Sequence, residues 1–132
     1  MIKKKTSKLI RLSKKNNFTM SVAESCTGGL LSSSIIQESG ASNFFHMGFI
    51  TYSNKAKINI LSVNPNIIKK YGAVSEETAL AMVKGVYKKT KSDLSISITG
   101  VAGPKGGNKI NPVGTVCFGI GINCKGKPII YK

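Results

Sequence analysis

Three segments of the sequence combine glycines with hydroxyl, thiol or amine side chains at the predicted ends of strands. They are Ala23 to Gly29, Tyr52 to Lys57 and Thr99 to Gly107. In open α/β sheets, ligands bind beyond the carboxyl ends of strands, where loops and helix starts present backbone N–H groups. Each segment alone also has an ordinary explanation, because a serine before a helix, such as Ser25, is more often a cap than a nucleophile.

Other residues near these segments offer chemistry of their own. Cys26 is intrinsically a stronger nucleophile than Ser25, but a small cysteine usually packs in the interior. Glu24 could hold Lys57 or a substrate hydroxyl, or it could cap the helix that follows. His46 has no partner at metal-ligand spacing, and the three cysteines form no CxxC pair. We therefore expect no metal, no disulfide framework and a reduced compartment.

The scaffold that must position these segments is predicted to alternate strands with helices. Strands are expected at Phe18 to Ala23, Phe44 to Ser53, Leu94 to Thr99, 116 to 122 and Pro128 to Lys132. Helices are expected at Thr6 to Asn17, from the 24–29 turn to about Glu38, at Asn54 to Leu61, at Pro65 to Tyr71 and after Ser75. This order predicts a layered α/β/α domain with a mixed, mostly parallel sheet.

The helix after Ser75 has the clearest signals. Ser75 is a typical N-cap, and Glu76 and Glu77 lie in the first turn, where the helix dipole favours anions. Ala79, Met82, Val83 and Val86 then form one apolar stripe. Gly119 and Gly121 leave one face of a late strand bare, so we expect another element to pack closely there.

Size and composition predict one compact domain over residues 1–132. The chain has 132 residues, of which 41% are hydrophobic, and no apolar run is long enough to span a bilayer. No secretory leader is recognisable at the lysine-rich start. We therefore expect a cytoplasmic protein with no membrane contact.

The net charge of +15 is the feature most easily mistaken for a nucleic-acid site. All but one of the 20 basic residues are lysine, Arg11 being the exception, and they are spread along a chain rich in Asn and Ile. This composition is typical of an AT-rich genome, whereas nucleic-acid sites favour arginine forks and aromatic platforms. We expect nonspecific binding at low salt and no specific nucleic-acid partner.

Four stretches in order resemble the motifs of one known family. They are AESCTGG at 23–29, GFITYSNKAK at 48–57, YGAVSEETA at 71–79, and SITGVAGPKGG with NPVGTV at 97–116. Over about residues 6–122 the chain resembles the C-terminal domain of the competence-damage-inducible protein family. The resemblance implies a nicotinamide-nucleotide amidase that releases ammonia from nicotinamide mononucleotide without a cofactor. It further implies that Ser25 is the nucleophile and Lys57 its base, with Tyr52 as the family tyrosine.

Amide hydrolysis by such a pair sets demands that the structure must meet. An ordinary lysine has a pKa of about 10.4, so only about one in a few thousand would be a free base at neutral pH. We therefore predict that Lys57 lies in a mostly closed pocket, while Lys55 points to solvent. Tyr52 is expected to hydrogen-bond either partner and to relay or orient the proton.

The remaining candidate residues are expected to hold the oxyanion or the substrate. The backbone N–H groups of residues 26–28 are the predicted oxyanion hole. Backbone at the glycine-rich loop is expected to approach the phosphate and ribose, although a plain tight loop remains an alternative, and Lys105 could reach a phosphate. The substrate-binding or oxyanion candidates are Glu24, Cys26, Thr27, Gly28, Gly29, Thr99, Gly100, Gly103, Gly106 and Gly107.

The chain departs from the family at its end. Relatives continue for some thirty residues, with an arginine-bearing segment and a closing helix, so the resemblance describes a C-terminally shortened, stand-alone form. We expect an exposed apolar sheet face, which would favour a homo-oligomer, such as a dimer. Two hypotheses stay open: an active amidohydrolase, or a relic that binds a nucleotide or a partner without turnover.

Overall fold

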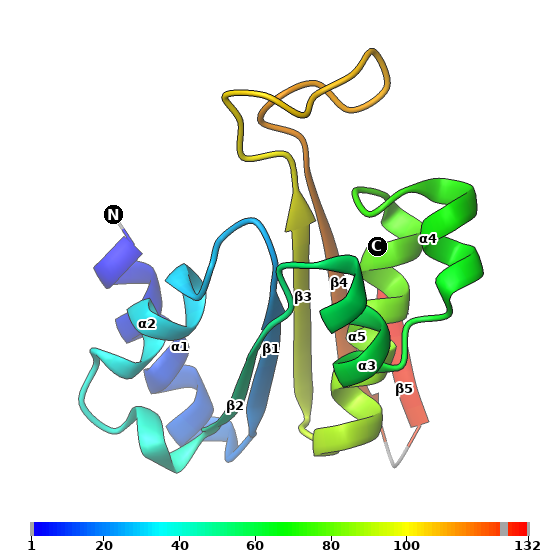
Figure 1. Cartoon of the computed structure of the whole chain (residues 1–132). Helices are drawn as coiled ribbons and strands as arrows, with labels where there is room; N and C mark the ends of the chain where they lie inside the picture. The colour runs from blue at the N-terminus through cyan, green and yellow to red at the C-terminus, as the bar shows by residue number, and fades with distance from the viewer. Residues whose placement is uncertain (1, 125–126, 132) are drawn as a thin grey trace.

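The structure is a computed structural model, and it describes residues 2–124 and 127–131. Figure 1 shows a central sheet with helices on both faces. The helices are α1 (Ile2–Asn16), α2 (Leu30–Ile36), the 3-10 turn η1 (Ala41–Asn43), α3 (Asn54–Leu61), α4 (Pro65–Tyr71) and α5 (Glu76–Thr90). The strands are β1 (Met20–Glu24), β2 (Phe45–Ile50), β3 (Leu94–Gly100), β4 (Val116–Cys124) and β5 (Lys127–Tyr131).

The sheet has the strand order β2-β1-β3-β4-β5. Strand β1 pairs in parallel with β2 and with β3, while β4 pairs antiparallel with β3 and with β5. Among the described strands, only β4 therefore runs against the others, and the prediction of a mixed, mostly parallel sheet is confirmed. The carboxyl ends of β1, β2 and β3 lie at one edge of the sheet, which is where their loops can meet.

Helices α1 and α2 cover one face of the sheet, on the left in Figure 1. Their apolar faces join β1 in one buried cluster. Its fully buried members are Ile10, Met20, Val22, Ile35, Ala41 and Phe44. Burial of its larger side chains stabilises the fold by about 1.5–3 kcal/mol each, so this cluster anchors α1 and α2 to β1.

Helices α3, α4 and α5 cover the other face. Ser75 caps α5 by accepting a hydrogen bond from the Thr78 N–H at 3.1 Å, as predicted. Gly119 lets α5 approach the sheet, because a Cβ there would lie 2.7 Å from the carbonyl oxygen of Ala79. The second buried cluster on this face joins β1 to these helices through Ala23, Leu61, Val63, Met82 and Val86.

The predicted elements all occur, with shifted bounds. The opening helix starts at Ile2, before the predicted Thr6, and β1 extends one residue further, to Glu24. The helix after the glycine turn starts only at Leu30, so Ser25 lies in the turn and not at the helix start itself. The last predicted strand is β5, and Lys132 lies outside the described residues.

One row of β4 side chains is exposed, as expected from the departure from the family pattern. Alternate residues project from the face of β4 that lies opposite Gly119 and Gly121, away from α5. Their exposed fractions lie between 39% and 50% for Val116, Phe118, Ile120 and Ile122. No helix among the described residues is long and apolar enough to cross a bilayer.

Candidate active site

Ser25 is held at the end of β1 by backbone hydrogen bonds. Its N–H donates to the carbonyl oxygen of Ile98 in β3 at 3.0 Å, and its own carbonyl accepts from the Gly28 N–H at 3.1 Å. Gly28 and Gly29 have backbone φ angles of 57° and 101°, which residues with a Cβ rarely adopt. The glycines therefore make the sharp turn that leads from Ser25 into α2.

Lys57 reaches the Ser25 hydroxyl from α3. Its Nζ lies 3.0 Å from Ser25 Oγ, although the two residues are 32 positions apart. The side chain is 1% exposed, so the predicted burial is confirmed, and Lys55 is exposed as expected. Helix α3 fixes this position because it is capped by Ser53, whose hydroxyl accepts from the Ala56 N–H at 3.0 Å.

Two backbone carbonyls complete the surroundings of the Lys57 amine. Nζ donates to the carbonyl oxygen of Thr51 at 3.0 Å and to that of Tyr52 at 3.4 Å. None of the carboxylates in the described part of the chain forms an ion pair with it. Burial lowers the pKa of Lys57 below its ordinary value, and the nearby Cys26 thiol opposes this only in part. The contacts thus orient the amine, while burial favours its neutral form.

Glu24 holds the start of α2. Its carboxylate is fully buried and accepts from the Leu31 N–H at 3.0 Å, the Ser32 N–H at 2.7 Å and the Ser32 hydroxyl at 2.7 Å. Burial alone would raise the pKa of Glu24, but these bonds and the Thr27 hydroxyl lower it overall. Of the two predicted roles, the structure therefore shows the cap of the following helix and no contact with Lys57, while contact with a substrate hydroxyl stays a prediction.

The predicted oxyanion donors are reduced from three N–H groups to two. The Gly28 N–H is used inside the turn, in its bond to the Ser25 carbonyl. No oxygen of the described residues accepts from the N–H groups of Cys26 and Thr27. Burial raises the pKa of the Cys26 thiol. The two N–H groups lie beside the thiol and lower its pKa by a smaller amount, so the net shift is upward. The thiol is thus a poor source of thiolate, and the N–H groups of Cys26 and Thr27 remain the candidate oxyanion donors.

Tyr52 lies at the rim of the site. Its side chain is 72% exposed, and its backbone carbonyl, not its hydroxyl, contacts Lys57. No hydrogen bond joins the Tyr52 hydroxyl to Ser25 or Lys57 in the described structure. The role of the Tyr52 hydroxyl in relaying a proton stays a prediction, because the contact with Lys57 is made by the backbone carbonyl alone.

The glycine-rich loop meets the turn at residues 25–29 through Gly100. A Cβ on Gly100 would lie 2.9 Å from Cys26 Sγ and 2.6 Å from the Thr115 carbonyl oxygen, so this position must be small. Thr99 is buried, and its hydroxyl donates to the Ala73 carbonyl at 2.8 Å just before α5, while its contact with substrate stays a prediction. The other candidates lie along the loop that projects beyond β3 in Figure 1, where contact with substrate stays a prediction: Gly103, Gly106 and Gly107.

One contributor to the site, Thr51, had no recognisable signal in the residue pattern. Thr51 is fully buried, its N–H donates to the Glu24 carbonyl at 2.8 Å, and its carbonyl accepts from Lys57. A backbone carbonyl can be supplied by any residue type, so no residue pattern could have marked it. Thr51 therefore ties the end of β1 to the amine that faces Ser25.

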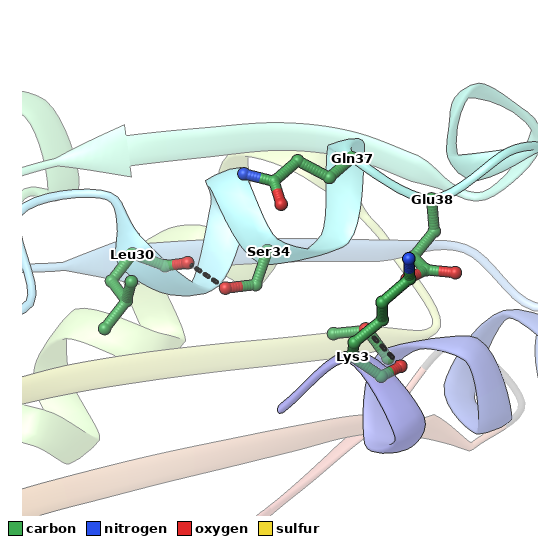
Figure 2. Close-up of a pocket in the computed structure, with 6 residues that line it drawn as sticks. Lys3, Leu30, Ser34, Gln37 and Glu38 are labelled. Carbon is green, nitrogen blue, oxygen red and sulfur yellow. Dashed lines mark hydrogen bonds between the residues drawn. The ribbon is translucent and has the colours of Figure 1, made fainter. Parts of the chain in front are cut away.

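A separate pocket between α1 and α2 does not belong to this site. Figure 2 shows it, with the Ser34 hydroxyl bonded to the Leu30 carbonyl at 2.7 Å. Its lining residues are Lys3, Thr6, Leu30, Ser34, Gln37 and Glu38. Neither Ser25 nor Lys57 reaches this pocket.

Comparison with known proteins agrees with the geometry. The model of the CinA C-terminal domain matches residues 2–129. A CinA-like protein of Leptospira biflexa is 52% identical over 103 residues, which are 78% of this chain and 25% of that protein. A CinA-like protein of Kosmotoga olearia is 47% identical over 124 residues, which are 94% of this chain and 30% of that protein. The chain thus spans about a quarter of the length of these relatives.

Solved structures of the same kind superpose on the whole domain. A competence/damage inducible protein of Agrobacterium tumefaciens has a TM-score of 0.92 at 33% identity, covering 98% of this chain and 78% of that one. A CinA superfamily protein of Escherichia coli has a TM-score of 0.87 at 36% identity, covering 99% and 75%. The chain belongs to the CinA C-terminal domain family.

Proposed function

We propose that this domain is an amidohydrolase that converts the carboxamide of nicotinamide mononucleotide to the carboxylate and releases ammonia. One observation carries the proposal: a buried lysine amine with a lowered pKa lies 3.0 Å from the hydroxyl of a serine in a tight turn. A buried lysine with no carboxylate partner is unfavourable as a structural element, so a chemical role accounts for its presence.

The proposed reaction begins when Ser25 Oγ attacks the carboxamide carbon. The neutral amine of Lys57 accepts the hydroxyl proton along the 3.0 Å contact. The oxygen that becomes negative is stabilised by the N–H groups of Cys26 and Thr27, which is the usual work of an oxyanion hole.

The second half of the reaction returns the proton and frees the serine. The Lys57 ammonium gives its proton to the departing nitrogen, the C–N bond breaks, and ammonia leaves an acyl ester on Ser25. Water then attacks this ester with the Lys57 amine as base, which yields the carboxylate and the free hydroxyl. No step requires a metal, and the described residues include no cluster of metal ligands.

Ammonia release from nicotinamide mononucleotide tests the proposal. Ser25→Ala and Lys57→Met are expected to lower kcat/KM by at least about 10²–10⁴-fold, the range for loss of a positioned base. Lys55→Met is the matched control, because Lys55 is on the same helix and exposed, and it should leave the rate unchanged.

Two further outcomes separate this mechanism from its rivals. Cys26→Ser should retain activity, since the raised pKa of the thiol argues against it as the nucleophile. A wild-type protein that binds the mononucleotide in calorimetry but releases no ammonia that depends on Ser25 would contradict the proposal and identify a binding relic.

A further inference from the structure

The loop between β3 and β4 projects beyond the carboxyl ends of β1 and β3, as Figure 1 shows. It comprises residues 101–115 and follows Gly100 directly, where a Cβ would lie 2.9 Å from Cys26 Sγ. The loop therefore starts beside the turn that holds Ser25. Ligands bind at this edge of an α/β sheet, so the position of the loop matters for any molecule bound at Ser25.

The two arms of this loop pack against each other. A Cβ on Gly103 would lie 2.5 Å from Val113 Cγ1, and a Cβ on Gly107 would lie 2.7 Å from the Val113 backbone nitrogen. At the base of the loop, the Val101 N–H donates to the Thr115 carbonyl at 2.9 Å. The glycines let the arms close on Val113, so the loop is a compact unit that must be oriented as a whole.

Asn111 is the point at which this unit is bonded to the body of the domain. Its side-chain Nδ2 donates to the Val74 carbonyl at 2.9 Å. Every other residue from 104 to 114 is exposed, whereas Asn111 is partly buried. In the described part of the chain, no other side-chain hydrogen bond of the loop reaches outside it.

The Val74 end of this bond is itself held in place. The Gly72 carbonyl accepts from the Thr78 hydroxyl at 2.6 Å, and the Ala73 carbonyl accepts from the Thr99 hydroxyl at 2.8 Å. This segment between α4 and α5 is therefore tied both to α5 and to β3. A loop that is bonded to Val74 is fixed relative to the helix and to the sheet.

A local turn presents the Asn111 side chain to Val74. The Asn108 side-chain oxygen accepts from the Ile110 N–H at 2.9 Å and from the Asn111 N–H at 2.7 Å. The Asn108 N–H in turn donates to the Asn111 carbonyl at 3.0 Å. These bonds use the backbone of Asn111 and leave its side chain to reach out of the loop. A change of that side chain therefore removes the link to Val74 and keeps the turn.

We propose that Asn111 is a positioning residue, whose bond to Val74 holds the projecting loop where it contacts substrate bound at Ser25. The effect on substrate rests on the proposed amidase function, whereas the hold on the loop does not. No hydrogen bond joins residues 101–115 to Ser25 or Lys57 among the residues that the structure describes. An unheld loop must be ordered when substrate binds, which weakens binding and leaves the chemical step as it is.

Trypsin cleavage after Lys105 tests the hold on the loop. Lys105 is exposed, and cleavage of a folded protein follows how often the segment opens. Asn111→Ala should speed cleavage of the Lys105–Gly106 bond by roughly 2- to 10-fold, the range for one lost hydrogen bond. Asn111→Asp should act in the same direction, because a carboxylate cannot donate to the Val74 carbonyl.

Ile110→Ala is the matched control. The Ile110 side chain is 87% exposed, and the variant keeps the backbone N–H that bonds to Asn108. Its cleavage after Lys105 should match that of the wild type. Unchanged cleavage in Asn111→Ala, or an equal rise in Ile110→Ala, would overturn the hold on the loop.

Ammonia release from nicotinamide mononucleotide reads the effect on substrate. Asn111→Ala should raise KM by roughly 2- to 10-fold and leave kcat unchanged, the signature of lost binding. A lower kcat at unchanged KM, or no change in either, would overturn the positioning role. If the wild type releases no ammonia, the proposed function fails, and cleavage after Lys105 still decides whether Asn111 holds the loop. Calorimetry with the mononucleotide then decides the positioning role, which an equal Kd in Asn111→Ala, or no binding by the wild type, would contradict.

Discussion

At the scale of single residues, the site depends on a lysine that is held without an opposite charge. Three oxygen atoms surround Lys57 Nζ, and all belong to neutral groups. Hydrogen bonds to the ammonium favour its charged form, whereas burial disfavours it, and the net effect lowers the pKa. The site thus keeps the amine oriented in either protonation state.

The lowered pKa of Lys57 predicts the pH dependence of activity. In the proposed mechanism the neutral amine is the active form, so kcat/KM for ammonia release should rise with pH and level off above the Lys57 pKa, which lies below 10.5. Lys57→Arg should lose the activity at every pH, because a guanidinium does not deprotonate in this range. Lys55→Arg, with the wild-type pH profile, is the control. A rate that falls as pH rises through neutrality would contradict the assignment.

The same shift predicts a stability change of definite sign. Between the lowered pKa and 10.5 the unfolded chain binds the proton at Lys57 more tightly than the folded chain. The free energy of unfolding therefore rises with pH across this window, by linkage. Lys57→Met should remove the rise, as measured by urea unfolding at several pH values. Equal slopes for the variant and the wild type would show that Lys57 is not the group responsible.

At the scale of elements, the sequence was sufficient to place the helices and strands but not their exact ends. Period-two and helical patterns identified β3 and α5. The buried face of β3 is nevertheless the polar one, because Ser95, Ser97 and Thr99 are fully buried and Ser97 donates to the Ala79 carbonyl of α5. The pattern around Glu24 left two roles open, a contact with Lys57 or substrate and a cap of the following helix. The start of α2 depends on Glu24 accepting from Leu31 and Ser32, a contact across seven and eight positions that only the folded turn creates.

The residue pattern alone could identify only one member of the Ser25–Lys57 pair. Ser25 stands out as a serine in a glycine turn, but nothing local distinguishes Lys57 from the other lysines. Its burial arises because α3 packs with Leu61 against the second cluster, so the helix points Lys57 back toward β1. Resemblance to a family supplied the pairing, and the tertiary packing supplies its physical reason.

Loss of the Glu24 charge tests how the turn is held. Glu24→Gln places an amide where the carboxylate accepts three bonds, and the NH₂ group then faces an N–H donor. We expect the free energy of unfolding to fall by about 1–3 kcal/mol in denaturant titration. Glu38→Gln is the control, because the Glu38 carboxylate is partly exposed and accepts a hydrogen bond from the Ser7 hydroxyl. An equal effect of both substitutions would contradict the role of the buried carboxylate.

The Glu24 contribution also has a predictable pH window. The folded-state pKa is lowered below 4.5, so the stabilisation is present above that value and is lost as pH falls through the folded-state pKa. Acid unfolding of Glu24→Gln should accordingly show a shallower loss of stability below 4.5 than the wild type does. If the stability of Glu24→Gln and of the wild type fell equally steeply with pH, other carboxylates would be responsible for the loss of stability in acid.

Gly85 tests whether the α3–α5 contact positions the base. A Cβ on Gly85 would clash with the Leu61 carbonyl oxygen at the end of α3. Gly85→Ala should destabilise the fold by about 1–3 kcal/mol through overpacking. It should also lower kcat, because α3 carries Lys57. Lys84→Ala, on the exposed side of the same turn, is the control and should change neither stability nor kcat. A Gly85→Ala protein with wild-type stability and activity would show that this contact does not position α3.

At the scale of the whole molecule, the positive charge is spread unevenly along the sequence. Asn16 to Asn54 contains no lysine or arginine, while helix α1 alone contains seven within Ile2–Asn16. Folding brings part of this charge back beside the lysine-free segment, because Lys14 Nζ would lie 2.8 Å from a Cβ on Gly40 and Lys3 lines the pocket between α1 and α2. A sequence segment without lysine is therefore not a surface without lysine.

The basic part of the surface is expected to bind nucleic acid only through phosphate charge. With 19 of the 20 basic residues being lysine, as Arg11 is the one arginine, the surface lacks the paired donors that read bases. Fluorescence anisotropy with duplex DNA should therefore show binding at about 50 mM salt that weakens by about 10³-fold or more by 200 mM. Shuffled duplexes of equal length should bind equally, because counterion release does not depend on sequence. Tight binding to one sequence at the higher salt would instead establish a recognition site that lysine charge alone does not explain.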